Sequence, residues 1–219
     1  ADLEEAMNQP VNSVKLNILG TALVLNLCKK YKVKRFIHAS TIYVNSVEGG
    51  FYRSSKRAAE DYVEEYNKIH NLEYTILRFG SLYGQRSDKN NGVRIMLKEA
   101  IFNNAIQYTG SKKTVRRYIH VSDAARACID SLKPKYKNKY LTITGKKEIK
   151  ITTFLKNLAK MLKITKKIKF KNIKSIGHYE TTPFTYKLKK GQFYKQKKCI
   201  DIYDGILQLV QEIKNKKIK

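Results

Sequence analysis

The segment "KRFIHAST" (34–41) is a short apolar run between charged residues and a Ser-Thr pair. This pattern predicts a buried strand. The preceding segment, "NSVKLNILGTALVLNLCKKYKV" (12–33), has apolar residues at helical spacing, and residues 49–71 form an amphipathic pattern. A second predicted strand, "LEYTILRFGSLYG" (72–84), ends in a Gly-containing loop. Helix, strand, helix and strand with short connections are typical of a parallel sheet covered by helices, so we predict an α/β fold.

The remainder of the chain alternates further helices with short strands. Ser122 or Asp123 is the expected N-cap of one helix. The sequence contains no internal repeat and no long linker, so we expect one packed unit. The predicted helices are 92–105, 122–133, 151–164 and 203–219, and the predicted strands are 106–110, 116–121, 138–145 and 167–173.

The composition is that of a globular protein, with 42% hydrophobic and 11% aromatic residues in 219. We find no apolar run near the roughly 18–20 residues of a membrane helix, so we expect no membrane partner. The opening "ADLEEAMNQP" has neither the basic region nor the apolar region of a signal peptide. Cys28, Cys128 and Cys199 lack metal-ligand or CxxC spacing. Reduced thiols, a cytoplasmic location and no metal are therefore expected.

The net charge of +27 is concentrated in the second half of the chain, where residues 101–219 hold 30 basic and 7 acidic residues. Three interpretations are open. The lysines can form a solvated surface in a chain rich in Lys, Ile and Asn, or bind an anionic small molecule, or contact nucleic acid. Because no recognised nucleic-acid module or basic–aromatic RNA-binding motif is present, we expect no nucleic-acid partner.

Tyr52 and Lys56 are four residues apart in the predicted helix 49–71, so the phenol and the ammonium lie on one face. A pair at this spacing occurs in many helices and alone indicates nothing more than packing. The motifs around the pair decide whether it has a catalytic role.

Five motifs occur in an order that resembles the NAD-dependent epimerase/dehydratase family, extended short-chain dehydrogenases that act on sugar nucleotides and include UDP-galactose 4-epimerase. The resemblance covers residues 1 to about 145. It implies the C-terminal part of a Rossmann-like parallel sheet with helices on both faces, in residues 1–85, and a smaller mixed α/β substrate region, 86–219, packed on the first. The motifs are "LNILGT" (16–21), "ASTIYV" (39–44), "YRSSK" (52–56), "LRFGSLYG" (77–84) and "RRYIHVSDAARA" (116–127).

The resemblance assigns catalysis to Tyr52, Lys56 and Thr41. Tyr52 would take the proton from the sugar hydroxyl as hydride leaves for NAD. A free phenol, with a pKa of about 10, is a poor base at neutral pH, and a nearby ammonium would favour the phenolate. Lys56 would supply that ammonium and bind the nicotinamide ribose. Thr41 would bind the reacting oxygen, with Ser40 as the neighbouring alternative.

Further residues follow from the same resemblance. Cofactor contacts are implied for Lys56, Tyr52, Ser40 and Phe79, with NAD as the cofactor and NADP left open. Substrate contacts are implied for Thr41, Ser81, Asn91 and Arg116, where the Arg116 guanidinium would bind a diphosphate. Ser81 departs from the Asn found in many members. Asn17 would have a structural role beneath the site. Residues 177–186, "GHYETTPFTY", either line the substrate cleft or form a surface loop.

The residues after Thr41 bear on the reaction. Dehydratases of this family carry Asp-Glu there, because the elimination of water needs an additional acid and base. This chain has Ile42 and Tyr43 instead, and "VNS" (44–46) where "VYG" is familiar. We therefore expect a sugar-nucleotide 4-epimerase or 4-ketoreductase rather than a dehydratase.

The 219 residues contain no G-x-x-G-x-x-G turn, through which the family binds the cofactor pyrophosphate. Two hypotheses follow. Either the cofactor half lies in a preceding or companion segment of an active enzyme, or the chain is a non-catalytic sugar-nucleotide binding or structural remnant. A nucleic-acid binder is a distant third. The resemblance also implies a homodimer whose interface is formed by the first two helices and the helix at Tyr52.

Overall fold

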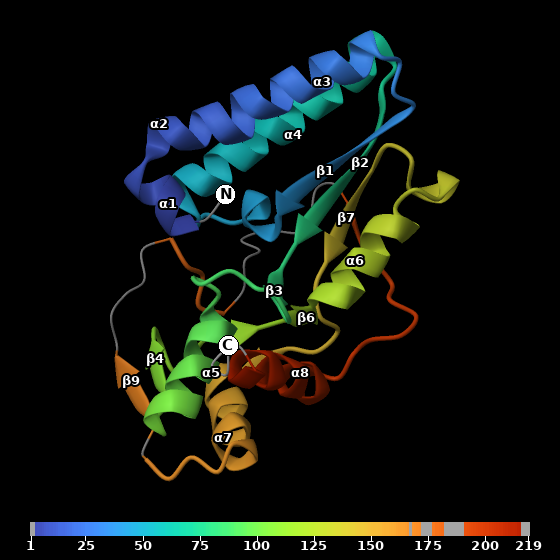
Figure 1. Ribbon diagram of the computed structural model, residues 1–219. Helices are drawn as coiled ribbons and strands as arrows, with labels where there is room; N and C mark the ends of the chain where they lie inside the picture. The colour runs from blue at the N-terminus through green and yellow to red at the C-terminus, as the bar shows by residue number, and fades with distance from the viewer. Residues whose placement is uncertain (1–2, 167, 172–176, 182–190, 216–219) are drawn as a thin grey trace.

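The computed structural model describes residues 3–166, 168–171, 177–181 and 191–215. Its main sheet is entirely parallel, as the sequence predicts, and is visible in the upper half of Figure 1. At the carboxyl end of the sheet, Thr41 pairs with Phe79 and Phe79 pairs with Ile143. In sheet order the strands are β1 (Arg35–Thr41), β2 (Glu73–Phe79), β7 (Lys139–Ile143) and β10 (Gln192–Phe193).

Two long helices cover one face of this sheet, and α6 covers the other (Figure 1). The first follows α1 (Leu3–Asn8) and runs without interruption over Pro10–Lys30. The second is α4 (Gly50–His70), which lies beside it, and α6 is Val121–Asp130. Helices on both faces are as expected. The Pro10–Lys30 helix consists of α2 (Pro10–Ser13), a π-helical stretch (Val14–Leu19) and α3 (Gly20–Lys30).

The start of α6 differs from the sequence prediction. The N-cap is His120, whose Nδ1 accepts a hydrogen bond from Ser122 N at 3.2 Å. Ser122 and Asp123 are therefore inside the helix, and the expectation that one of them caps it was wrong. An imidazole acceptor replaces the usual hydroxyl or carboxylate here, which sequence rules for caps do not anticipate.

The lower half of the molecule is a mixed α/β region around its own apolar core (Figure 1). In the described part of the chain, it contains three two-stranded sheets and three helices. The strands β7 and β10 also come from residues 86–219, yet they complete the main sheet, so the two regions share strands and the boundary at residue 85 stays a prediction. The helices are α5 (Gly92–Asn103), α7 (Ile151–Met161) and α8 (Ile202–Asn215); the paired strands are β3 (Ser81–Tyr83) with β6 (Tyr118–His120), β4 (Gln107–Thr109) with β9 (Lys169–Lys171), and β5 (Val115–Arg116) with β8 (Ile149–Lys150).

Short 3-10 helices occupy Ile42–Asn45 and Pro134–Tyr136. Parts of several predicted segments (residues 167, 172–173, 182–186 and 216–219) lie outside the described residues.

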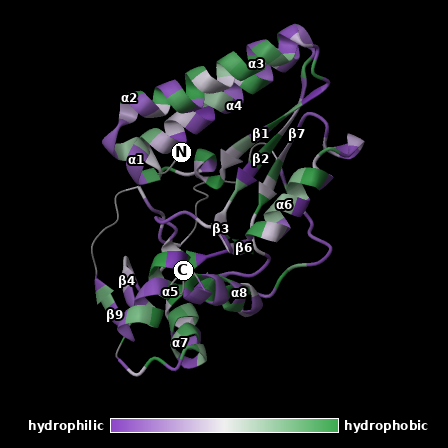
Figure 2. Ribbon diagram, in the orientation of Figure 1, coloured by the Kyte–Doolittle hydropathy of each residue, from purple (hydrophilic) through white to green (hydrophobic). Residues whose placement is uncertain are grey.

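The Pro10–Lys30 helix corrects the expectation that no segment is long and apolar enough for a membrane helix. It has 21 residues and a mean hydropathy of 1.3 over its most apolar window, so one helix among the described residues is long and apolar enough to cross a membrane. A helix of a soluble protein can pass the same test. This one packs on α4 through one face and leaves another apolar face exposed, with Leu16, Leu23 and Leu27 at 50–57% exposure. Figure 2 shows the green segments along it.

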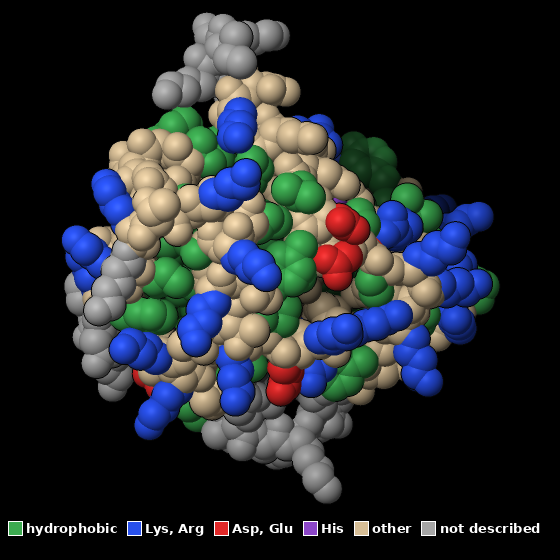
Figure 3. All heavy atoms as spheres, turned by 90° about the horizontal axis from the view of Figure 1, so that it is seen from below, with side chains coloured by type: hydrophobic (Ala, Val, Ile, Leu, Met, Phe, Trp, Pro, Cys, Tyr) green, Lys and Arg blue, Asp and Glu red, His purple; other side chains and the backbone are tan. Residues whose placement is uncertain are grey.

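The basic residues on the face seen from below in Figure 3 are spread over that face. In the view from below (Figure 3), Lys and Arg side chains are distributed across the whole visible face, with hydrophobic and neutral side chains between them. They do not line one groove on this face. Such a distribution is typical of a solvated surface, the first of the three interpretations of the charge.

Candidate active site

Thr41 stands at the carboxyl end of β1, the edge of a parallel sheet at which ligands bind in open α/β folds. Its side chain is 5% exposed, and Oγ1 accepts a hydrogen bond from Tyr43 N at 3.4 Å. This contact makes Thr41 the N-cap of the Ile42–Asn45 turn. Phe79 is its register partner on β2 and is partly buried against the apolar core on the α6 side.

The first turns of α4 place Tyr52 and Lys56 beside this strand end. The helix predicted for residues 49–71 is confirmed, so the two side chains share one face. Gly49 precedes the helix with φ +100°, and a Cβ there would lie 2.9 Å from Tyr43 Cδ1, so glycine allows the close approach. Lys56 Nζ donates to the Ala39 carbonyl at 3.1 Å. Burial lowers the pKa of Lys56, and the Glu60 carboxylate partly opposes this.

An aromatic cluster connects Tyr52 to the rest of the site. The Tyr43 and Tyr52 rings meet edge to face at 6.2 Å, and the Tyr43 and Tyr179 rings lie 5.4 Å apart. The Tyr43 hydroxyl is 3.3 Å from His178 Nδ1. Burial raises the pKa of Tyr43, with a smaller contribution from Tyr179 in the same direction, so its hydroxyl stays neutral at physiological pH.

Arg116 and Ser81 reach the same cluster through Tyr179. The Arg116 guanidinium lies over the Tyr179 ring at 4.1 Å, and its Nη1 donates to the carbonyls of Val115 and Glu180 at 3.0 and 3.2 Å. Ser81 Oγ is 3.5 Å from the Tyr179 hydroxyl. Contacts thus run from Tyr52 through Tyr43 and Tyr179 to Arg116 and Ser81, two of the four predicted substrate residues. Stacking on Tyr179 holds the guanidinium in place.

Two other predicted residues have structural partners. Ser40 lies next to Thr41 on the opposite face of β1, and its hydroxyl donates to the buried carboxylate of Glu60 at 2.5 Å. Asn91 caps α5: its Oδ1 accepts from Arg94 N at 3.2 Å, and its Nδ2 donates to the Leu82 carbonyl at 2.9 Å. These contacts occupy both side chains, and the ligand contacts implied for them stay predictions.

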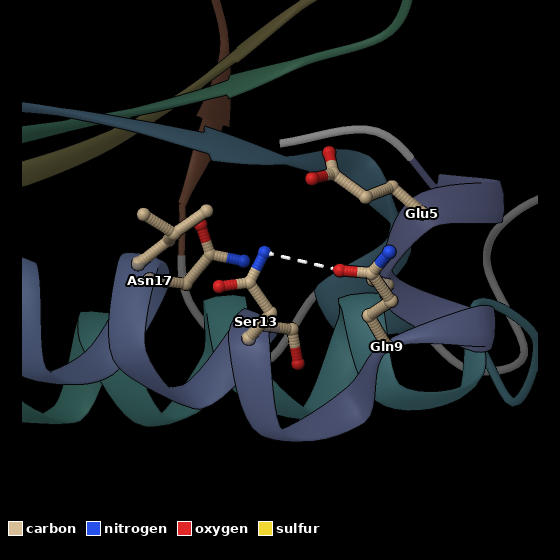
Figure 4. A pocket seen from close by; sticks show the side chains of 7 residues that line it. Glu5, Gln9, Ser13 and Asn17 are labelled. Carbon is tan, nitrogen blue, oxygen red and sulfur yellow. Dashed lines mark hydrogen bonds between the residues drawn. The ribbon is translucent and has the colours of Figure 1, made fainter.

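Asn17 supports α4 from behind. Its Nδ2 donates to Ser55 Oγ at 3.0 Å, and Ser55 lies between Tyr52 and Lys56 in the sequence. Asn17 also lines a shallow, open pocket where α1 meets the Pro10–Lys30 helix, together with Glu5, Gln9 and Ser13 (Figure 4). None of the predicted catalytic or ligand-binding residues lines this pocket.

A family model described as "NAD dependent epimerase/dehydratase family" matches residues 1–140. The chain belongs to the NAD-dependent epimerase/dehydratase family. It is 25% identical, over 98% of its length and 74% of the relative, to a protein of Methanocaldococcus jannaschii named "Putative UDP-glucose 4-epimerase".

Solved structures share the fold over nearly the whole chain. A UDP-glucose 4-epimerase of Thermotoga maritima, crystallised with UDP-glucose, superimposes with a TM-score of 0.83 and 23% identity, over 100% of this chain and 75% of that one. A UDP-glucuronic acid 4-epimerase of Bacillus cereus, in complex with UDP-glucuronic acid and NAD, gives 0.78 and 22%, over 92% and 68%. At these identities the likeness establishes the α/β fold with its parallel sheet.

The family uses NAD, and the residues of this epimerase-family chain fit one end of that cofactor. An ammonium and a phenol on one face of α4, next to a strand end, suit the ribose and nicotinamide. The 219 residues include no glycine-rich turn of the kind that binds the pyrophosphate, so the comparison concerns the ribose and nicotinamide end of the cofactor. The residues of this chain that fit the cofactor are therefore Tyr52 and Lys56.

Sequence reasoning missed three residues of this family member's candidate site. Glu60 follows Lys56 by four positions, so helical spacing was a usable signal for it. Tyr43 was considered only as a poor acid or base, and its packing on Tyr52 depends on the 3-10 turn. For Tyr179 the choice between cleft and surface loop was open, and the structure places it against Tyr43 and Arg116 with 6% exposure.

Proposed function

We propose that this chain carries the catalytic pair and the substrate side of an NAD-dependent sugar-nucleotide 4-epimerase, with a 4-ketoreductase as the closely related alternative. The observation that carries the proposal is the position of Tyr52 and Lys56, which share one face of α4, with Lys56 bonded to β1 two residues before Thr41. Family membership supports the enzyme class, and the residues at the strand end support the reaction.

The turn after Thr41 favours epimerisation or reduction over dehydration. Its residues, Ile42–Asn45, include no carboxylate. Ile42 is 4% exposed, and burial keeps the Tyr43 hydroxyl protonated. Elimination of water needs an additional acid and base, which this turn does not supply. A 4-epimerase or ketoreductase needs neither.

The proposed roles follow from the chemistry of each group. Bound NAD would accept a hydride from the sugar and return it. Tyr52 would take and return the proton of the reacting hydroxyl, and the nearby Lys56 ammonium would favour the phenolate form. Thr41 would donate a hydrogen bond to the same oxygen. Arg116, held on Tyr179, would bind the diphosphate of a sugar nucleotide.

A second candidate function is sugar-nucleotide binding without turnover. The observation that favours it is the shared contact of Arg116 and Ser81 with Tyr179. Under this alternative, Arg116, Tyr179 and Ser81 would still form a binding surface. An active enzyme would instead obtain the pyrophosphate site from a companion segment.

The test is Tyr52→Phe, compared with Tyr62→Phe on the exposed side of the same helix. Turnover of UDP-glucose should fall by about 10²–10⁴-fold in the first variant, the contribution typical of general acid–base catalysis, and stay unchanged in the second. Calorimetric titration with NADH and with UDP-glucose should give unaltered affinities. Turnover is measured with the segment that carries the glycine-rich turn supplied. Unchanged turnover in Tyr52→Phe would sink the assignment, and UDP-glucose binding without turnover in that unmutated assembly would select the binding function.

The homodimer expected from the resemblance has a matching surface. Leu16 and Leu23 on the Pro10–Lys30 helix are 56% and 57% exposed, and Phe51, Tyr62 and Ile69 project from α4 with 46–67% exposure. Burying such a surface in a second copy is favourable. We therefore propose a dimer through these helices. Sedimentation at micromolar concentration should show a dimer that Leu16→Lys with Leu23→Lys converts to a monomer; a monomeric unmutated chain would contradict it.

A further inference from the structure

Glu60 is a buried carboxylate whose hydrogen bonds come from two strands. It lies on α4 with 3% exposure. Oε1 accepts from Ser40 Oγ of β1 at 2.5 Å and from Arg78 Nε of β2 at 3.0 Å, and Oε2 accepts from Arg78 Nη2 at 2.6 Å. The carboxylate therefore ties the helix to both strands that end at the candidate site.

Arg78 is fixed on its other side as well. Its guanidinium lies 4.3 Å from the centre of the Tyr140 ring of β7, and the residue is 6% exposed. Ser40 and Arg78 are register partners on neighbouring parallel strands. The two donors to Glu60 are therefore held at a set spacing by the sheet itself.

Lys56 and Glu60 hold consecutive residues of β1. Lys56 Nζ bonds the carbonyl of Ala39, and Glu60 bonds the side chain of Ser40. The next residue along the strand is Thr41. Two side chains one turn apart on α4 thus bond the strand at Ala39 and Ser40, the two residues directly before Thr41. Tyr52 lies one turn before Lys56 on the same helix.

We propose that Glu60 is a positioning residue of the active site: it fixes α4, and with it Lys56 and Tyr52, against the ends of β1 and β2. This inference rests on the proposed function for its catalytic meaning. The effect of Glu60 on the pH at which Lys56 loses its proton can be measured without turnover.

The charges around Lys56 support this role. Glu60 of α4 acts on the charge of Lys56, and Lys56 acts in turn on His38 of β1. Burial lowers the pKa of His38 to about 4, so His38 is neutral at pH 7. Burial also lowers the pKa of Lys56, and Glu60 raises it. The anionic Glu60 therefore opposes the loss of the Lys56 proton.

A purely structural role is the alternative for Glu60. Buried ion pairs contribute little net stability compared with apolar residues of similar volume, so a scaffold does not need one here. A positioning role predicts that Lys56 responds to the Glu60 charge. A structural role predicts that only the unfolding free energy changes.

The experiment is Glu60→Gln, with Asp61→Asn as the matched control because Asp61 is exposed on the same helix and carries the same charge. Pulses of acetic anhydride at stepped pH, read by mass spectrometry of the peptide containing Lys56, report the pH at which Lys56 loses its proton. The midpoint should move to lower pH in Glu60→Gln, stay in Asp61→Asn, and be restored in Glu60→Asp, which keeps the charge. An unchanged midpoint in folded Glu60→Gln would overturn the proposal.

Glu60→Gln removes the carboxylate that the buried Arg78 guanidinium bonds, so a second variant guards against misfolding. Glu60→Gln with Arg78→Met removes both charges at similar volume and should move the Lys56 midpoint in the same direction but by less, because loss of the Arg78 cation favours the ammonium form. If the midpoint in this variant equals that of the unmutated chain, the proposal fails. A shifted midpoint in a chain that shows no turnover would support the positioning of Lys56 while rejecting the proposed function.

Discussion

Strand β2 presents Arg78 to one face of the main sheet and Leu77 to the other. On the α4 face, Arg78 meets the buried Glu60 carboxylate. On the α6 face, Leu77 packs with Leu141 of β7 and Ala124 of α6. The α4 face therefore holds a buried ion pair beside an apolar cluster that includes Val63 and Ile76, whereas the residues named on the α6 face are all apolar.

The two faces differ because α4 carries candidate catalytic side chains and α6 does not. The apolar α6 face only has to exclude water, which interchangeable side chains can do. The α4 face also contains His38, and its helix bears Tyr52 and Lys56. Buried charges need specific partners, so they fix a geometry that apolar packing leaves adjustable. The sheet thus combines a packing face with a face that holds a candidate active site in register.

The largest expected effect that tests this contrast comes from Arg78→Ala. The change leaves the buried Glu60 carboxylate without its guanidinium partner and should lower the unfolding free energy by about 3–5 kcal/mol. The matched variant on the other face, Leu77→Ala, should cost about 2–5 kcal/mol through lost burial and a cavity. Urea unfolding of each variant measures both values.

The magnitudes overlap, so a coupling measurement separates the two faces. Combined with Glu60→Gln, the Arg78→Ala variant should cost clearly less than the sum of the single changes, because the stranded charge has gone. Leu77→Ala with Glu60→Gln should be additive within about 0.5 kcal/mol. Equal coupling for both pairs would mean that the two faces do not differ as described.

Local pattern was sufficient for the elements but not for the contacts between them. The apolar runs at 34–41 and 72–79 predicted β1 and β2, and amphipathic spacing predicted α4. Strand alternation sends Ser40 and Thr41 to opposite faces, but the sequence does not say which face carries the ligand. The structure adds that Ser40 bonds Glu60.

Contacts between distant segments were beyond the sequence. Tyr179 lies 98 positions after Ser81 and meets it only because the fold returns the chain to β3. No spacing rule connects such residues. The length of the first helix was predicted to within a few residues, but its capacity to pass as a membrane span was missed, since its polar residues divide the apolar run when read in order.

The smallest of these effects is a dependence of the unfolding free energy on pH, caused by His38 on the α4 face of the sheet. His38 is 5% exposed, and its Nε2 has no hydrogen-bond partner among the described residues. Burial, with a smaller contribution from Lys56, lowers the pKa of His38 from 6.5 to about 4. The unfolded chain binds the proton near pH 6.5 and the folded chain only near pH 4. The contribution of neutral His38 is therefore complete above pH 6.5 and is lost as the pH falls toward 4.

The loss should amount to about 3 kcal/mol between pH 7 and pH 4, since each pKa unit corresponds to about 1.4 kcal/mol. Carboxylates titrate in the same range, so the informative quantity is the difference between variants in urea unfolding. His38→Phe should remove this part of the acid sensitivity, whereas His70→Phe, at the exposed end of α4, should retain it. Equal acid sensitivity in both variants would show that His38 is accessible to protons in the folded chain. The α4 face of the sheet would then be open to water rather than sealed by α4.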